Sequence, residues 1–226
     1  VGINIPSING FNATVSIDDR QAMHVAVKHL FSMGHRRIAY AYETSNDNNQ
    51  NMVFSAEARL HGLMETAEER KMTVERIAIR NYEDATNTIL NSLLTMDPAP
   101  TALYCESDEL ALPVIYKLCQ YGHAVPQELS VIGFDDVPLA AKIGLTTLHQ
   151  DPFNMGENAA RKMLSVMSGK TPKPLHETLQ AQLMMPLLPR QRVLYGTYAV
   201  TDCPTGYESE ITIQSDLGAS ASSSNL

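Results

Sequence analysis

Two adjacent carboxylates that follow an apolar run are the residues of this chain best placed to bind a small molecule. Asp135 and Asp136 come directly after Leu129–Gly133 and Phe134, a pattern that predicts a short buried strand. In an open α/β sheet, ligands bind just beyond the carboxyl ends of the strands. A carboxylate at such an end accepts hydrogen bonds more strongly than a neutral group does. The alternative is a turn or cap role, which is common for Asp after a strand.

Three further polar or aromatic side chains have the chemistry of a ligand site. Arg59 follows the polar segment TSNDNNQNM, near the start of an expected helix. Its guanidinium has fixed donors that suit vicinal hydroxyls or a purine edge, although an arbitrary helix arginine is usually solvated. The ring of Tyr82 can stack on a sugar or a purine, and plain packing explains it equally well. Gln150 is consistent either with a ligand contact or with a role in fixing a hinge.

Apolar periodicity predicts alternating helices and strands. The helical stripes span residues 22–31, 55–70, 84–94, 108–121 and 152–167, and the strands span 36–41, 74–79, 102–104 and 129–133. Asp18 with Gln21 forms a capping box for the first helix, and Asp151 with Pro152 opens the last one. Strands that alternate with helices predict an α/β fold with a doubly wound parallel sheet.

Composition and motifs argue against several other classes of protein. The 17 basic and 25 acidic residues give a formal charge of −8, which disfavours general nucleic-acid binding. We find no signal-peptide pattern, no membrane-length apolar run and no cofactor, metal or catalytic motif. Ser168–Thr171 resembles the end of a phosphate-binding loop but lacks its leading glycine. Because these enzyme motifs are missing, we do not expect an enzyme. Cys105, Cys119 and Cys203 have no CxxC spacing, so we expect free thiols in a cytoplasmic protein.

Several segments, in this order and at this spacing, resemble the lactose/galactose repressor family of bacterial transcription regulators. They are GHRRIAY (34–40), the AxxRxxG pattern at 56–62, PTALYCESDELA (100–111), VPQELSVIGFDD (125–136), LTTLHQD (145–151) and NMGENAA (154–160). The resemblance covers residues 1–193.

The resemblance implies a periplasmic-binding-protein-like core of two similar subdomains joined by three crossovers. On this sequence, residues 1–18 and 151–179 belong to an incomplete amino-terminal subdomain, and residues 19–150 and 180–194 form the carboxyl-terminal one. The returning strand of the latter is expected near 182–193. The resemblance also implies that the helix-turn-helix headpiece is missing here. We expect residues 195–226, which are rich in Ser, Ala and Gly, to be a disordered tail.

The same resemblance implies roles for individual residues. Arg59 corresponds to the residue that grips the effector, and Asp135 to the one that accepts hydrogen bonds from sugar hydroxyls or a base. Ser107 stands where relatives commonly have Asn, and Asn4 where many have Asp. Both are ligand candidates, and a contact at Ser107 would need a closer or water-bridged ligand.

The sequence therefore predicts the effector-sensing core of a repressor-type regulator. Its expected effector is a small sugar or a purine-like molecule, and no cofactor or metal is expected. The resemblance implies a homodimer for the full-length parent and contact with operator DNA only through the missing headpiece. The alternative is a solute-binding protein that serves a sugar transporter, since such proteins share the fold.

Overall fold

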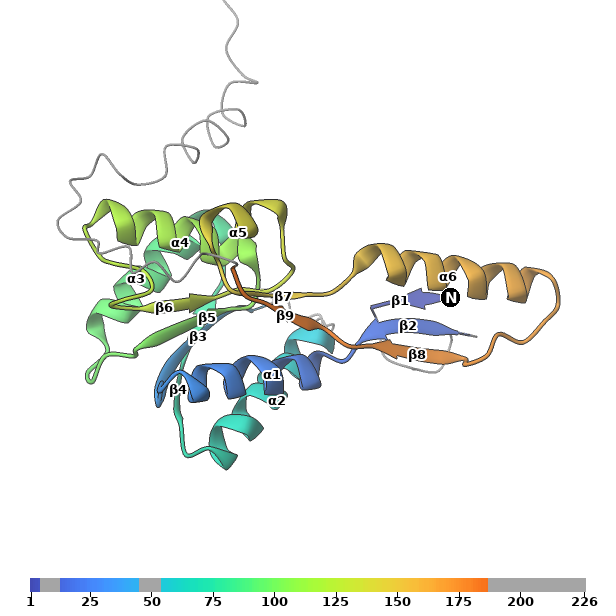
Figure 1. Ribbon diagram of the computed structural model, residues 1–226, viewed down its shortest axis with the longest axis horizontal. Helices are drawn as coiled ribbons and strands as arrows, with labels where there is room; N and C mark the ends of the chain where they lie inside the picture. Colours follow the sequence, from blue (N-terminus) through green and yellow to red (C-terminus); the bar gives the residue numbers. More distant parts are fainter. Residues whose placement is uncertain (5–12, 45–53, 187–226) are drawn as a thin grey trace, which may run out of the picture.

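Two lobes of unequal size form the protein (Figure 1). In this computed structural model the described residues are 1–4, 13–44 and 54–186. The expected tail at 195–226 lies outside them. Within these described ranges, three chain segments join the lobes, at residues 17–19, 149–152 and 179–182. Two of these segments are tied together, because the backbone N–H of Asp18 donates to the carbonyl of Leu179 over 2.9 Å.

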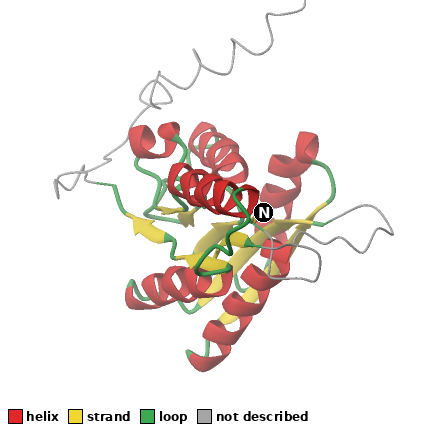
Figure 2. Ribbon diagram, turned by 90° about the vertical axis from the view of Figure 1, so that its right-hand side faces the viewer, coloured by secondary structure: helices red, strands yellow, loops and turns green. Residues whose placement is uncertain are grey.

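The larger lobe is a parallel sheet covered by helices on both faces (Figures 1 and 2). Its main strands lie in the order β4-β3-β5-β6. Strand β7 pairs with the antiparallel strand β9. Isolated bridges connect the β7 region to β6 and to the loop that follows β6, which extends the sheet. The strands are β3 (Arg37–Glu43), β4 (Thr73–Ile79), β5 (Ala102–Cys105), β6 (Ser130–Ile132), β7 (Thr147–His149) and β9 (Gln182–Met184). The helices are α1 (Asp19–Ser32), α2 (Phe54–Glu69), the 3-10 turn η1 (Tyr82–Asp84), α3 (Ala85–Thr95), α4 (Asp108–Gln120) and α5 (Pro138–Ile143).

Two apolar layers, one on each face of this sheet, make the core. Helices α1 and α2 pack on one face around Met23, Leu63 and Phe134, all of which are fully buried. Helices α3, α4 and α5 cover the other face, where Ile89 and Val114 are fully buried. The predicted α/β fold with parallel strands is confirmed. The predicted strand at 182–193 is shorter than expected among the described residues, because β9 ends at Met184 and residues from 187 lie outside them.

Local sequence explains where the helices of the larger lobe begin. The Asp18 side chain accepts a hydrogen bond from the N–H of Gln21, as the capping pattern predicts. The Ser107 side chain accepts from the N–H of Leu110 and caps α4 in the same way. Helix caps of this kind satisfy backbone donors that have no partner within the helix.

The smaller lobe is a parallel sheet of order β1-β2-β8 with one helix. Its elements are β1 (Gly2–Ile3), β2 (Thr14–Ile17), α6 (Pro152–Met167) and β8 (His176–Leu179). The buried apolar core is small and consists of Val15, Ile17, Met155 and Ala159. Lys162 is also buried on α6, where its Nζ lies 3.1 Å from Glu177 Oε2 and donates to the carbonyl of Pro174.

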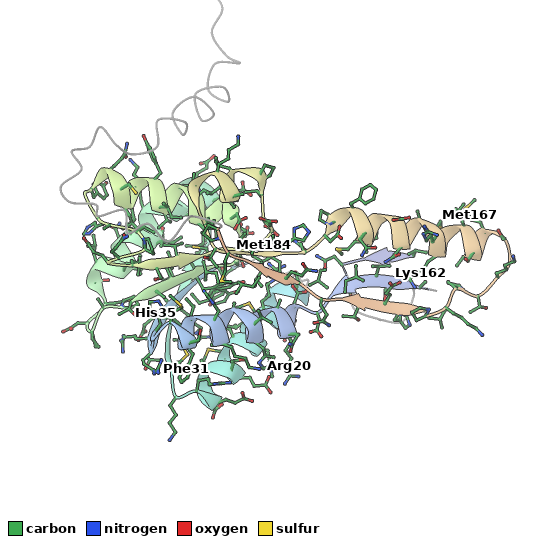
Figure 3. The ribbon with its side chains drawn as sticks, viewed as in Figure 1. Arg20, Phe31, His35, Lys162, Met167 and Met184 are labelled. Atoms are coloured by element: carbon green, nitrogen blue, oxygen red, sulfur yellow. The ribbon has the colours of Figure 1, made fainter. Side chains whose placement is uncertain are left out.

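The outer face of α6 exposes apolar side chains. Only part of the apolar stripe predicted for residues 152–167 is buried. Ala159 is buried, whereas Leu164 is 64% exposed and Met167 is 76% exposed. Met167 lies near the end of the helix that is farthest from the larger lobe (Figure 3). An exposed apolar face of this kind contributes little to the stability of its helix in water.

We therefore predict that amide hydrogen exchange is faster in α6 than in α1 and α4. Local opening costs less free energy where few apolar contacts would be lost. Exchange followed by mass spectrometry on the whole chain measures this directly. Equal protection of residues 152–167, 19–32 and 108–120 would contradict the prediction.

Candidate functional site

The carboxyl ends of both parallel sheets face the junction between the lobes. Strand β7 ends there and the chain continues into α6, while β2 and β8 end there and continue into α1 and β9. The polar residues that follow the strands of the larger lobe are therefore gathered at one edge. We describe this edge as the junction site, formed by residues that follow β3, β4, β5, β6 and β7 and by Asp19, which follows β2.

Arg59 from α2 is the central group of the junction site. Its Nε donates to Asp19 Oδ1 over 2.7 Å, and its Nη1 donates to the carbonyl of Glu106 over 3.1 Å. The guanidinium carbon lies 3.6 Å from the centre of the Phe134 ring, which is a cation–π contact. These three contacts come from α1, from the end of β5 and from the loop after β6, so Arg59 has little freedom to move.

Arg59 and Asp19 form a nearly buried ion pair, with side chains that are 11% and 8% exposed. Burial favours the neutral form of Arg59, but the charge of Asp19 and its hydrogen bond outweigh burial, so the pKa of Arg59 is raised. Burial also raises the pKa of Asp19, against the lowering effect of Arg59. Arg59 therefore keeps its positive charge, and the Asp19 carboxylate is its ion-pair partner.

Asp135 reaches the same place from the loop after β6. Its backbone N–H donates to the carbonyl of Leu148 over 2.8 Å, and its carboxylate accepts a hydrogen bond from the Gln150 amide. Burial raises the pKa of Asp135, whereas the charge of Arg59 lowers it, which places the two side chains within electrostatic range of each other. The structure thus brings Arg59, Asp135 and Gln150 together.

The backbone of this loop adopts an unusual conformation. Asp135 and Asp136 have φ angles of 109° and 57°. Residues other than Gly, Asn and Asp rarely adopt positive φ angles. His149 Nδ1 lies 3.0 Å from Asp136 Oδ2, and the N–H of Asp136 donates to Thr147 Oγ1 over 3.3 Å. Contacts to the residues of β7 therefore hold both aspartates in place.

Asp108 ties the loop after β6 to the first turn of α4. Its carboxylate accepts hydrogen bonds from Thr147 Oγ1 over 2.7 Å and from the N–H of Val137 over 3.0 Å. Its own N–H donates to the carbonyl of Phe134 over 2.7 Å. A Cβ atom at Gly133 would lie 2.0 Å from Asp108 Oδ1, so the close approach requires glycine at that position. Burial, only partly opposed by these hydrogen bonds, raises the pKa of Asp108 to about 6.

Tyr82 and Ser107 form a second group at the same edge. A hydrogen bond joins their side chains, and Tyr82 is 37% exposed. Glu106 connects this pair to Arg59. The charge of its side chain raises the pKa of Tyr82, and its backbone carbonyl accepts a hydrogen bond from Arg59. The Glu106 carboxylate itself accepts from the N–H of Glu43 over 2.6 Å.

Asn4 belongs to the other lobe, at the carboxyl end of β1. Its N–H donates to the carbonyl of Val15 over 2.8 Å, and its φ angle is 55°. The described contacts of Asn4 do not include Arg59 or Asp135. Its assignment as a ligand residue stays a prediction.

Sequence reasoning missed the groups that surround Arg59. Asp19, Glu106 and Phe134 were not candidates, because only the structure shows that Asp19 is buried in the first turn of α1. The hydroxyls of Tyr40 and Tyr104 were also missed. Both are buried and have no hydrogen-bond partner within the described ranges, and both lie in the electrostatic neighbourhood of Arg59.

No group of three or more His, Cys, Asp or Glu residues in the described part of the chain has an arrangement that could hold a metal ion. Within the same residues, no helix has both the length and the apolar character needed to cross a membrane.

Comparison with known proteins places the chain in a family. A model of the periplasmic binding protein-like domain matches residues 27–185. The HTH-type transcriptional regulator reg1 of Streptomyces lividans is 34% identical over 191 residues, which are 78% of this chain and 53% of that protein. The HTH-type transcriptional repressor PurR of Haemophilus influenzae (strain PittEE) is 31% identical over 170 residues, 71% of this chain and 48% of that protein.

Solved structures of regulators have the same fold. A LacI transcriptional regulator from a Rhodococcus species superposes with a TM-score of 0.68 at 25% identity, covering 81% of this chain and 66% of that one. The transcriptional regulator CelR in complex with cellobiose gives a TM-score of 0.67 at 26% identity, covering 81% of this chain and 56% of that one.

The chain belongs to the periplasmic binding protein-like domain family, and its resemblance to the lactose/galactose repressor family is confirmed. It spans about half the length of the curated relatives named above.

Asp108 makes a testable contribution to pH dependence. Its folded-state pKa of about 6 is above the ordinary value of 3.8, so the stability linked to this group is present below 3.8 and is lost as the pH rises toward 6. We expect Asp108→Asn, which keeps the shape and an acceptor oxygen, to flatten the decrease in unfolding free energy between these pH values. Denaturant titrations at several pH values measure this decrease, and an identical pH dependence in the variant would contradict the assignment.

Proposed function

We propose that this chain is the effector-sensing core of a bacterial transcription regulator, and that it binds a small, hydroxyl-rich molecule at the junction site without changing it chemically. The observation that carries the proposal is the convergence of Arg59, Asp135 and Gln150 at the carboxyl edge of the sheet. Arg59 and Gln150 donate hydrogen bonds and Asp135 accepts them, which is the combination that a vicinal diol needs.

The relatives support a regulator more than a transport protein. Both reg1 and PurR are HTH-type regulators, and the structure of CelR contains cellobiose. In this proposal the parent protein acts in the cytoplasm as a homodimer, and it contacts operator DNA through a headpiece outside this sequence. Closure of the two lobes around the effector would change the relative orientation of the headpieces. A solute-binding protein of a sugar transporter is the second candidate, and only the shared fold favours it.

Substitution of Arg59 tests the binding site. Cellobiose is the first probe, and ribose and adenosine extend the panel. For the probe that binds, Arg59→Ala should weaken affinity by roughly 1.5–3 kcal/mol, because a charged hydrogen-bond donor is lost from a buried site. Isothermal titration calorimetry gives the affinity.

Two further variants make this result interpretable. Arg20→Ala is the matched control, because Arg20 pairs with Glu65 on the outer surface of α1 and α2 and its side chain is 52% exposed (Figure 3). Asp135→Asn keeps the shape of the loop and tests the acceptor separately, in case Arg59→Ala does not fold. Unchanged affinity in folded Arg59→Ala would exclude Arg59 as a ligand residue.

A further inference from the structure

Within the described residues, the junction site gathers more carboxyl groups than basic side chains. Asp19, Glu106 and Asp135 all act electrostatically around Arg59. Among the described residues, Arg59 is the basic side chain whose charge lowers the pKa of each of these three carboxyl groups.

The positive charge of Arg59 is already matched by a carboxylate. Asp19 lies 2.7 Å from its Nε, and both side chains are nearly buried, so solvent screens this pair only weakly. A phosphate or carboxylate of a ligand would compete with Asp19 for the same guanidinium, and it would also approach Asp135. Like charges brought together in a partly buried site oppose binding.

Three other polar groups of the site carry no charge. Gln150, Ser107 and Tyr82 offer an amide and two hydroxyls, and Asp135 offers a charged acceptor for an O–H donor. Next to Arg59, the Tyr104 side chain is 1% exposed and its hydroxyl has no hydrogen-bond partner among the described residues.

We propose that the junction site selects an uncharged, hydroxyl-rich effector and rejects phosphorylated or carboxylated ones. This inference rests on the proposed function and narrows its class of ligand. It divides sugars from sugar phosphates and nucleosides from nucleotides, in which a charged phosphate ester replaces one hydroxyl group.

Matched pairs of probes that differ in charge test the proposal by calorimetry on the whole chain. The pairs are cellobiose with cellobiose 6′-phosphate, ribose with ribose 5-phosphate, and adenosine with AMP. For a pair whose neutral member binds, we expect the anionic member to bind at least about tenfold more weakly, the ratio that corresponds to about 1.4 kcal/mol. Equal or tighter binding of the anionic member would overturn the proposal.

A variant separates charge from shape. Glu106→Gln removes a carboxylate that interacts electrostatically with Arg59. This carboxylate accepts a hydrogen bond from the N–H of Glu43, and we assign it no contact with the ligand. The variant should reduce the discrimination within a pair. Glu65→Gln, which removes an exposed acid paired with Arg20, is the control and should leave the ratio unchanged. Undiminished discrimination in Glu106→Gln would contradict the electrostatic explanation.

A probe without a sugar keeps the test independent of effector identity. Inorganic phosphate, compared with chloride at matched ionic strength, should give no saturable increase in melting temperature. A saturable increase that is lost in Arg59→Ala would overturn the inference whatever sugar binds. If no neutral probe binds, the proposed function and this inference both lose support, whereas equal binding of both members of a pair overturns the inference alone.

Discussion

The ion pair between Arg59 and Asp19 is the interaction on which the junction site depends. A guanidinium in a nearly buried position is destabilising unless a carboxylate and further acceptors compensate for the lost hydration. Here Asp19 supplies the charge, the Glu106 carbonyl accepts a second hydrogen bond, and the Phe134 ring lies against the guanidinium. The beginning of α1, the helix α2 and the turns after β5 and β6 are thereby fixed relative to one another.

Asp108 complements this pair on the other side of the sheet edge. It holds the loop that carries Asp135 by accepting from Val137 and Thr147, and Gly133 makes the close approach sterically feasible. The two aspartates of the loop adopt positive φ angles that cost conformational energy, so the hydrogen bonds of Asp108 and β7 compensate for that cost. A preorganised acceptor of this kind loses less entropy when a ligand binds.

Local signals in the sequence were sufficient for the main elements of the larger lobe. Apolar periodicity predicted its major helices and parallel strands, and Asp18 caps α1 as expected. Short elements such as β7 and α5 were not predicted, because three to six residues carry too little periodicity. The residues of the site were likewise predicted only in part. Strand-end position and the family motifs indicated Arg59 and Asp135, whereas the Asp19 contact joins residues 40 positions apart and leaves no local pattern.

A double-mutant cycle on Arg59 and Asp19 tests the central claim most directly. The unfolding free energies of the parent chain, Arg59→Met, Asp19→Asn and the double variant give the coupling energy of the pair. The account predicts a coupling of at least about 1 kcal/mol, because either single substitution leaves a buried group without its partner. Additivity within about 0.3–0.5 kcal/mol would contradict it, since it would show that the two residues contribute independently.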